Sequence, residues 1–180
     1  MLDGIEGAAA HGYFERLMLF NKSRFTWHGR RKHPAPDPLN ALLSLTYTLI
    51  THELTSLLDG VGLDPFLGFL HQIDYGRASL ALDLVEAFRA PIADRLVLRC
   101  VNLGIIGEHD FQHDAAENLS LLLPASAKRF FAEFENWMLE KREGGRSFRQ
   151  SLRLEVERMA SSIENATPWA SFRVARLSED

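Results

Sequence analysis

Apolar residues at helical spacing run through almost the whole chain, and this pattern limits the possible fold more than any other feature. In residues 39–58 (LNALLSLTYTLITHELTSLL) they recur three or four positions apart, which places them on one face of a helix. Alternation of apolar and polar residues, typical of a half-buried strand, is weak and confined to WASFRVAR near the C-terminus. The sequence therefore predicts an all-α, multi-helical fold.

Proline and glycine mark where these helices begin and end. Asp37-Pro38 is typical of a capped helix start, and Gly60 follows the end of that helix. The same dipeptide at Asp64-Pro65 predicts a short helix that ends near residue 69. The other predicted helices run from Ile5 to about Phe20, from Ser79 through a kink at Pro91 to Gly104, from Pro124 to about Arg142, and from Ser147 to about Glu164. The first of them is expected to turn Ile5, Ala9, Tyr13, Leu17 and Phe20 toward the core.

Length and composition favour a single globular domain. A chain of 180 residues with 46% apolar and 24% charged residues can bury one core, so we expect one domain over residues 1–180 with a tail from about residue 166. The net charge of -4 argues against unspecific DNA binding by bulk positive potential, so any DNA contact must use a local basic patch or a metal ion. Cys100 is the only cysteine, so it cannot form an internal disulfide, and its apolar neighbours predict burial.

The sequence shows no targeting or membrane signal. The N-terminal residues include acids and glycines rather than a basic region before an apolar run, and no stretch reaches about 18 uncharged apolar residues. We therefore expect a cytoplasmic protein with no membrane partner.

Glu53 interrupts the apolar stripe of the helix in residues 39–58. Burying a carboxylate alone costs far more than an ordinary side-chain contact returns, so Glu53 must be ion-paired, metal-bound or protonated. A buried ion pair with Arg95 or Arg99 is one interpretation, and a metal site is the other.

An acidic stripe and a histidine lie further along the chain. In SLALDLVEAFRA the polar residues Asp83, Glu86 and Arg89 recur every three positions and share one helix face. His71 lies in the preceding loop, where it is either an interior histidine or a ligand aimed by that loop. Two carboxylates and one imidazole suit Mg2+ or Mn2+.

Four motifs carry a resemblance to a known family: GIEGAAA, NALLS, VGLDPFLGFLH and SLALDLVEAFR. Over roughly Gly4 to Arg153 the chain resembles the CRISPR-associated adaptation endonuclease and integrase family, Cas-one. The resemblance implies a metal site made of Glu53, His71 and Glu86, with Asp83 as a nearby acid. Asp83 could bind a second cation, orient a ligand or hold an arginine.

The resemblance also implies a reaction and partners. Members of the family insert DNA segments (prespacers) into a CRISPR repeat with a partner, Cas-two, through attack of a 3'-hydroxyl on a phosphodiester, and many cleave DNA alone. They normally carry an N-terminal β-rich domain that builds a homodimer, whereas GIEGAAA begins here almost at Met1. We therefore expect the helical catalytic domain without that β domain.

The basic residues expected at the DNA are Arg24, Arg30, Arg31, Lys32 and Arg77. A solvated basic loop is the alternative for them, and Phe25 and Trp27 could stack on bases or anchor that loop. Arg149 and Arg153 are expected on an exposed helix face. His109 and His113 have the spacing of helix-borne zinc ligands, but the order His-Glu-x-x-His is absent, so we expect a helix start or loop there.

Three functions remain open at this point. The first is a metal-dependent DNA endonuclease and integrase domain. The second is a non-catalytic DNA-binding or assembly module, because we expect the β domain to be absent. The third is an unrelated metal-dependent hydrolase.

Overall fold

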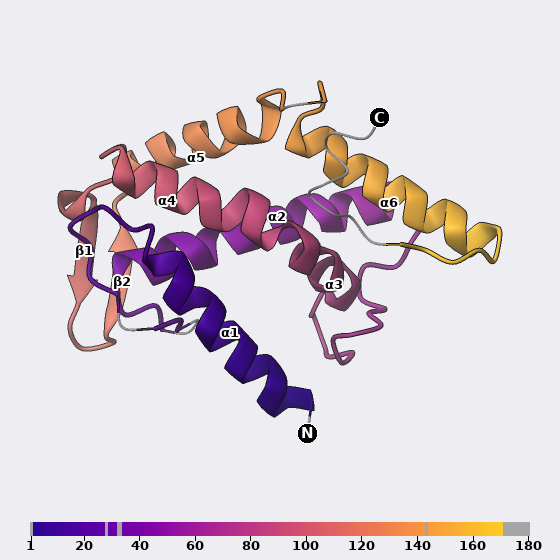
Figure 1. Cartoon of the computed structure of the whole chain (residues 1–180), viewed down its shortest axis with the longest axis horizontal. Coiled ribbons are helices and arrows are strands. Elements are labelled where there is room, and N and C mark those ends of the chain that lie inside the picture. Colours follow the sequence, from indigo (N-terminus) through magenta and orange to yellow (C-terminus); the bar gives the residue numbers. More distant parts are fainter. Residues whose placement is uncertain (1, 28, 32–33, 143, 171–180) are drawn as a thin grey trace. The chain divides into compact units, whose positions relative to one another are not determined.

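The structure is a computed structural model that describes residues 2–27, 29–31, 34–142 and 144–170 (Figure 1). Its helices are α1 (Leu2–Met18), α2 (Pro38–Gly60), α3 (Ser79–Phe88), α4 (Arg95–Asn102), α5 (Pro124–Leu139) and α6 (Phe148–Glu164). A π-helical turn, Arg89–Asp94, joins α3 to α4, and a 3-10 turn, Glu108–Asp110, precedes the strands β1 (Phe111–Asp114) and β2 (Leu119–Leu122). The prediction of a mainly helical fold is confirmed.

The two strands correct the all-α prediction. They form an antiparallel hairpin in which Phe111 pairs with Leu122 and His113 with Ser120. The hairpin is fixed to the loop that precedes α2. The backbone N–H of Ser120 donates to the carbonyl of Ala35, and the hydroxyl of Ser120 donates to the carbonyl of Pro36. The alternating segment near the C-terminus falls mostly in residues 171–176, outside the described residues.

The chain divides into two compact units by its backbone contacts. Unit 1 comprises residues 1–46 and 94–134, and unit 2 comprises residues 47–93 and 135–180. Helices α2 and α5 and the run from α3 to α4 each contribute to both units. The expected single domain stays a prediction.

The start of α2 follows the predicted capping chemistry. The carboxylate of Asp37 accepts hydrogen bonds from the backbone N–H of Asn40 at 2.9 Å and from its side-chain amide at 2.7 Å. Pro38 occupies the first helical position, where its missing N–H costs nothing. A cap of this kind is worth about 1 kcal/mol.

The predicted kink at Pro91 is confirmed as the π-helical turn, since proline cannot supply the N–H that a regular helix needs there. Gly104, at a φ of 68°, follows the end of α4. Cys100 is fully buried, and burial raises the pKa of its thiol to about 12.

Each unit has a buried apolar core. In unit 1 the fully buried side chains include Leu39, Leu42, Leu96, Ile106 and Phe130. In unit 2 they include Ile50, Leu54, Leu58, Phe88 and Leu152. The apolar face predicted for α2 is therefore confirmed.

Two local predictions are wrong. Among residues 9–18 of α1, whose burial is described, Phe14 is the buried one (4% exposed), whereas Tyr13 and Phe20 on the predicted core face are 38% and 66% exposed. Residues 64–69 form turns rather than a short helix, because the Asp64 carboxylate accepts a hydrogen bond from the N–H of Phe66 within a turn.

No described helix is long and apolar enough to cross a membrane.

Candidate metal centre

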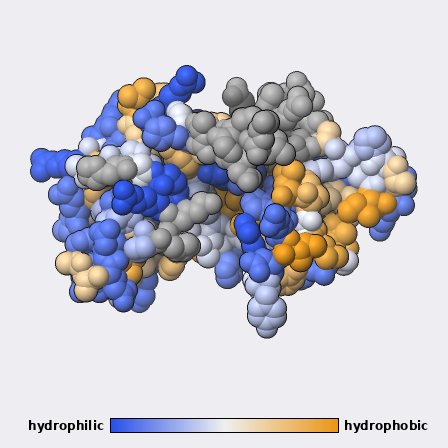
Figure 2. Space-filling model, turned by 90° about the horizontal axis from the view of Figure 1, so that it is seen from below, coloured by the Kyte–Doolittle hydropathy of each residue, from blue (hydrophilic) through white to orange (hydrophobic). Residues whose placement is uncertain are grey.

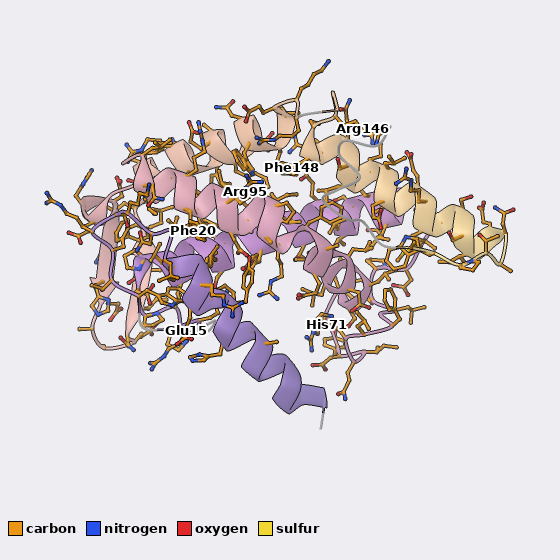
Figure 3. The ribbon with its side chains drawn as sticks, in the orientation of Figure 1. Glu15, Phe20, His71, Arg95, Arg146 and Phe148 are labelled. Atoms are coloured by element: carbon orange, nitrogen blue, oxygen red, sulfur yellow. The ribbon has the colours of Figure 1, made fainter. Side chains whose placement is uncertain are left out.

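Asp83 of α3 organises the loop that carries His71. Its carboxylate accepts hydrogen bonds from the backbone N–H groups of Phe69 (2.7 Å), Leu70 (3.0 Å) and His71 (2.9 Å). The same carboxylate lies 2.6 Å from Nδ1 of His71. These four contacts fix both the backbone and the imidazole of His71, which Figure 3 labels on the loop beside α3.

The loop lies tightly against the start of α3 at Gly68. A Cβ placed on Gly68 would meet Cβ of Ser79 at 2.6 Å, so only glycine fits this approach. The Ser79 hydroxyl donates to the carbonyl of Gln72, and the N–H of Leu80 donates to that of Pro65. Ser79 thus holds the loop against the start of α3, where the N-cap position is taken by Ala78 and no side chain makes a capping hydrogen bond.

Asp83 therefore orients His71, which was one of its three predicted roles. Burial alone would raise the pKa of Asp83, but hydrogen bonds from the Leu70 and Phe69 backbone and from His71 lower it below its ordinary value. The bond to Nδ1 leaves Nε2 as the imidazole nitrogen able to bind a ligand.

Glu53 of α2 is held by a partner that the sequence did not indicate. Nε of Arg149 in α6 donates to Oε1 of Glu53, so the predicted ion pair is found with Arg149, whereas the prediction named Arg95 or Arg99. Within the described part of the chain, Oε2 of Glu53 is buried and makes no hydrogen bond. Burial raises the pKa of Glu53, and Arg149 opposes part of that rise.

Glu86 occupies a more open position than the other two candidates. Its side chain is 45% exposed, and its carboxylate accepts a hydrogen bond from Nη1 of Arg89 at 2.7 Å. The Arg89 guanidinium also lies over the ring of Tyr47, 5.2 Å from its centre. Asp83 and Glu86 therefore serve different partners, although they lie three residues apart.

The expected convergence on one cation is not found among the described residues. No group of three or more His, Cys, Asp or Glu side chains there is gathered closely enough to hold a metal ion. The donor chemistry nevertheless fits a hard divalent cation at two points: a buried carboxylate oxygen without a hydrogen bond, and an imidazole oriented by a carboxylate.

The predicted DNA-contacting residues differ in their surroundings. The Arg30 guanidinium donates to the side chains of Asn40 (2.9 Å) and Ser44 (3.1 Å), so it holds the loop to α2. Arg24, Arg31 and Arg77 are exposed, and Lys32 lies outside the described residues.

Two hollows in unit 1 contain exposed basic residues. One, of about 440 Å³, is lined by Lys22, Arg24 and His109 among others, and another, of about 590 Å³, includes Arg31 and His113. Acidic side chains line them too: Glu108 lies in both hollows, and Asp37 lies in the second.

The aromatic residues of the basic loop anchor it to unit 1. Phe25 is buried and packs edge-on against Phe111 with the ring centres 5.8 Å apart. Trp27 packs against Phe14 at 6.0 Å. The alternative of base stacking by these two side chains is not favoured.

His109 and His113 do not share a helix face. His109 lies in the 3-10 turn and His113 on β1. The buried residue there is Asp110, whose carboxylate accepts hydrogen bonds from the Gly107 N–H, Ser126 and Arg129. The prediction of a helix start or loop holds for His109 in the 3-10 turn and is wrong for His113, which lies on a strand. Among the described residues, neither histidine belongs to a group of three or more His, Cys, Asp or Glu side chains that could hold a metal ion.

The loop around His71 also exposes apolar side chains. Leu67, Phe69, Leu70 and Ile73 are each more than half exposed, and Figure 2 shows apolar surface gathered on one side of the face it presents. Phe69 packs edge-on against Trp169, with ring centres 5.8 Å apart. Such a surface is typical of a contact site.

Comparison with known protein families identifies relatives along most of the chain. The family model described as CRISPR associated protein Cas1 matches residues 1–136. A CRISPR-associated endonuclease Cas1 from Thermodesulfovibrio yellowstonii is 40% identical over 141 residues, which are 78% of this chain and 44% of that protein. Another, from Chlorobaculum tepidum, is 42% identical over 132 residues, 72% of this chain and 38% of its own. The chain thus spans less than half the length of these relatives.

Solved structures give the same assignment. A CAS1 protein from Thermotoga maritima superposes with a TM-score of 0.83 at 27% identity, over 94% of this chain and 54% of that one. A casposase bound to its integration product also gives 0.83, at 25% identity over 95% of this chain and 49% of its own. A Cas6-RT-Cas1--Cas2 complex contains a chain that matches with 0.81 at 25% identity, over 96% of this chain and 19% of its own. From the family match and these relatives together, the chain belongs to the Cas1 family of CRISPR-associated proteins.

Proposed function

We propose that this chain is the DNA-processing domain of a CRISPR adaptation integrase, with divalent-metal-dependent phosphodiester cleavage and strand transfer. The observation that carries this proposal is the buried Oε2 of Glu53, which makes no hydrogen bond to the described residues. A carboxylate oxygen withdrawn from water without a donor is costly, and a cation offsets that cost. The names of the relatives, endonucleases and a casposase on its integration product, supply the reaction class.

Glu53, His71 and Glu86 are the proposed ligands of one Mg2+ or Mn2+. Bound there, the cation would neutralise charge on the phosphate and help activate the attacking hydroxyl or water. In the neutral tautomer that carries its proton on Nδ1, His71 would donate to Asp83 and keep the lone pair of Nε2 available for a cation. Glu86 joins the set by giving up its hydrogen bond with Arg89, which its exposed position permits.

DNA would be held by exposed basic side chains away from these ligands. Arg24 with Lys22, and Arg31, line the two hollows of unit 1, and Arg77 follows the His71 loop. Phosphate contacts of this kind position a duplex without reading its sequence. Arg30 has an internal role and is not included.

Cas2 and a second copy of the chain are the proposed protein partners. A structural neighbour belongs to a complex that contains Cas2, which is the support for that partner. The alternative function, a non-catalytic DNA-binding or assembly module, is favoured by the finding that no three candidate ligands are gathered in the described residues.

An assay of nicking and strand transfer on branched DNA separates the two functions. With Mn2+ the unmodified chain should be active, and Glu53→Ala and His71→Ala should each lower the rate by about 100-fold or more. Circular dichroism checks that both variants keep the helical fold. Unchanged rates in both variants exclude the proposed site, and DNA binding without activity in any divalent cation supports the assembly module.

A further inference from the structure

Arg149 makes a set of contacts unlike those of an ordinary surface arginine. Its Nη1 and Nη2 donate to the two carboxylate oxygens of Glu135 at 2.9 and 3.0 Å, while its Nε donates to Oε1 of Glu53. All three guanidinium nitrogens are therefore engaged, although the residue was predicted on an exposed helix face. The contact joins residues 96 positions apart in the sequence.

The first turn of α6, which carries Arg149, is fixed by a helix cap and by the packing of an aromatic side chain. Ser147 caps the helix, and its hydroxyl accepts a hydrogen bond from the N–H of Gln150 at 3.3 Å. Phe148, labelled in Figure 3 at the start of α6, is only 2% exposed and packs against Trp137 with ring centres 5.9 Å apart. A rigid backbone at this point fixes where the guanidinium lies.

The charges in this cluster do not cancel at Glu53. Two carboxylates share one guanidinium, so the group of Glu53, Arg149 and Glu135 carries a net charge of about -1 when ionised. Because the guanidinium of Arg149 also binds both oxygens of Glu135, its single positive charge does not neutralise both carboxylates at once. Oε2 keeps its capacity to bind a cation.

We propose that Arg149 is a positioning residue that fixes the Glu53 carboxylate through Oε1 and thereby directs Oε2 to a divalent cation. This inference rests on the proposed function, in which Glu53 is a metal ligand. Arg149 lies beyond residues 1–136, the part that matches the family model. The guanidinium acts on the cation only through Glu53, in the way that carboxylates behind metal-bound histidines act.

The test is a titration of the full chain with Mn2+. Binding is measured by calorimetry and by the electron paramagnetic resonance signal of free Mn2+. Arg149→Met should weaken Mn2+ binding by about tenfold, since partners behind a metal ligand are typically worth about 10–100-fold in affinity. Arg149→Lys keeps the positive charge but loses the planar guanidinium with its several N–H donors. Its Mn2+ affinity should therefore lie between that of Arg149→Met and that of the unmodified chain. Arg153→Met, one turn further along α6 and exposed, is the matched control and should change nothing.

Activity at varied Mn2+ distinguishes positioning from general damage. The concentration of Mn2+ for half-maximal nicking should rise by the same factor in Arg149→Met, while kcat at saturating Mn2+ stays within about threefold. In a Glu53→Gln background Arg149→Met should have no further effect on Mn2+ affinity. If Arg149→Met does not fold, Glu135→Gln tests the same inference. It should weaken Mn2+ affinity by less than tenfold.

Each remaining outcome overturns this inference. Unchanged Mn2+ affinity in Arg149→Met means that Glu53 does not need the guanidinium, and tighter affinity means that the guanidinium competes with the cation. If Glu53→Gln itself leaves Mn2+ binding unaltered, the proposed metal site fails, and the role of Arg149 fails with it. If Glu53→Gln weakens binding and Arg149→Met does not, only the role of Arg149 fails.

Discussion

Asp83 and Glu53 are carboxylates of the same unit, yet their surroundings satisfy them to very different degrees. The Asp83 carboxylate accepts hydrogen bonds from three backbone N–H groups and contacts the His71 imidazole. All four groups belong to residues 69–71 of one loop, which precedes Asp83 in the sequence. Glu53 receives one nitrogen of Arg149 at Oε1, and its buried Oε2 receives no hydrogen bond from the described residues. The difference indicates that Asp83 serves the structure of its loop, whereas Glu53 retains capacity for a ligand.

The largest expected difference between the two regions is in stability. Asp83→Asn should lower the free energy of unfolding by about 2 to 3 kcal/mol, because hydrogen bonds to a charged acceptor are each worth about 1.5–3 kcal/mol and an amide replaces them only in part. Glu53→Gln should change it by no more than about 1 kcal/mol, since the loss of one ion pair is offset by a lower cost of burial. Urea unfolding followed by circular dichroism measures both values. Equal losses in the two variants would contradict the comparison.

The pH dependence of Asp83→Asn sharpens the same comparison. The pKa of Asp83 is lowered in the folded chain, so its contribution is complete above its unfolded pKa of about 3.9 and is lost as the pH falls through the folded value. The gap in unfolding free energy between the unmodified chain and Asp83→Asn should therefore be constant from about pH 5 to 8 and shrink below about pH 4. A gap that widens toward acid pH would show that the sign is wrong.

A smaller effect is expected on metal binding through His71. Asp83→Asn should weaken Mn2+ affinity by about tenfold, because the carboxylate no longer fixes the imidazole. Calorimetric titration under conditions where the variant is fully folded measures this loss. Wild-type affinity in Asp83→Asn would mean that His71 does not need Asp83 as its partner.

The smallest effect on Mn2+ affinity is expected for Asp110, a buried carboxylate of unit 1. Asp110 is saturated by Gly107, Ser126 and Arg129, and hydrogen bonds from these groups outweigh burial and lower its pKa. Asp110→Asn should destabilise the chain but change Mn2+ affinity by less than about twofold. It is therefore the control for general damage, and a tenfold loss in this variant would remove the distinction between the units.

The sequence predicted the elements whose signals are local. Asp37 and Pro38 gave the start of α2, and Pro91 gave the break between α3 and α4, because capping and the missing proline N–H act within one turn. The hairpin was missed, since each strand has four residues, too few for a period of two to be distinguished.

The candidate site was predictable only where one segment contains its own signal. Glu53 was recognised because a carboxylate in an apolar stripe needs a partner, but Arg149 was not, because the choice of partner among distant arginines depends on the tertiary fold. The spacing of Asp83 and Glu86 suggested one shared function, yet one is buried under the loop and the other lies 45% exposed beside Arg89. Helical spacing gives direction around an axis and does not show which neighbour covers each face.

The central claim is that Glu53 binds a divalent cation, and a titration of Mn2+ into the unmodified chain and into Glu53→Gln tests it most directly. The account predicts one Mn2+ per chain for the unmodified protein, with affinity reduced at least about 100-fold in Glu53→Gln at nearly unchanged stability. Equal affinity and stoichiometry in the two proteins would contradict it.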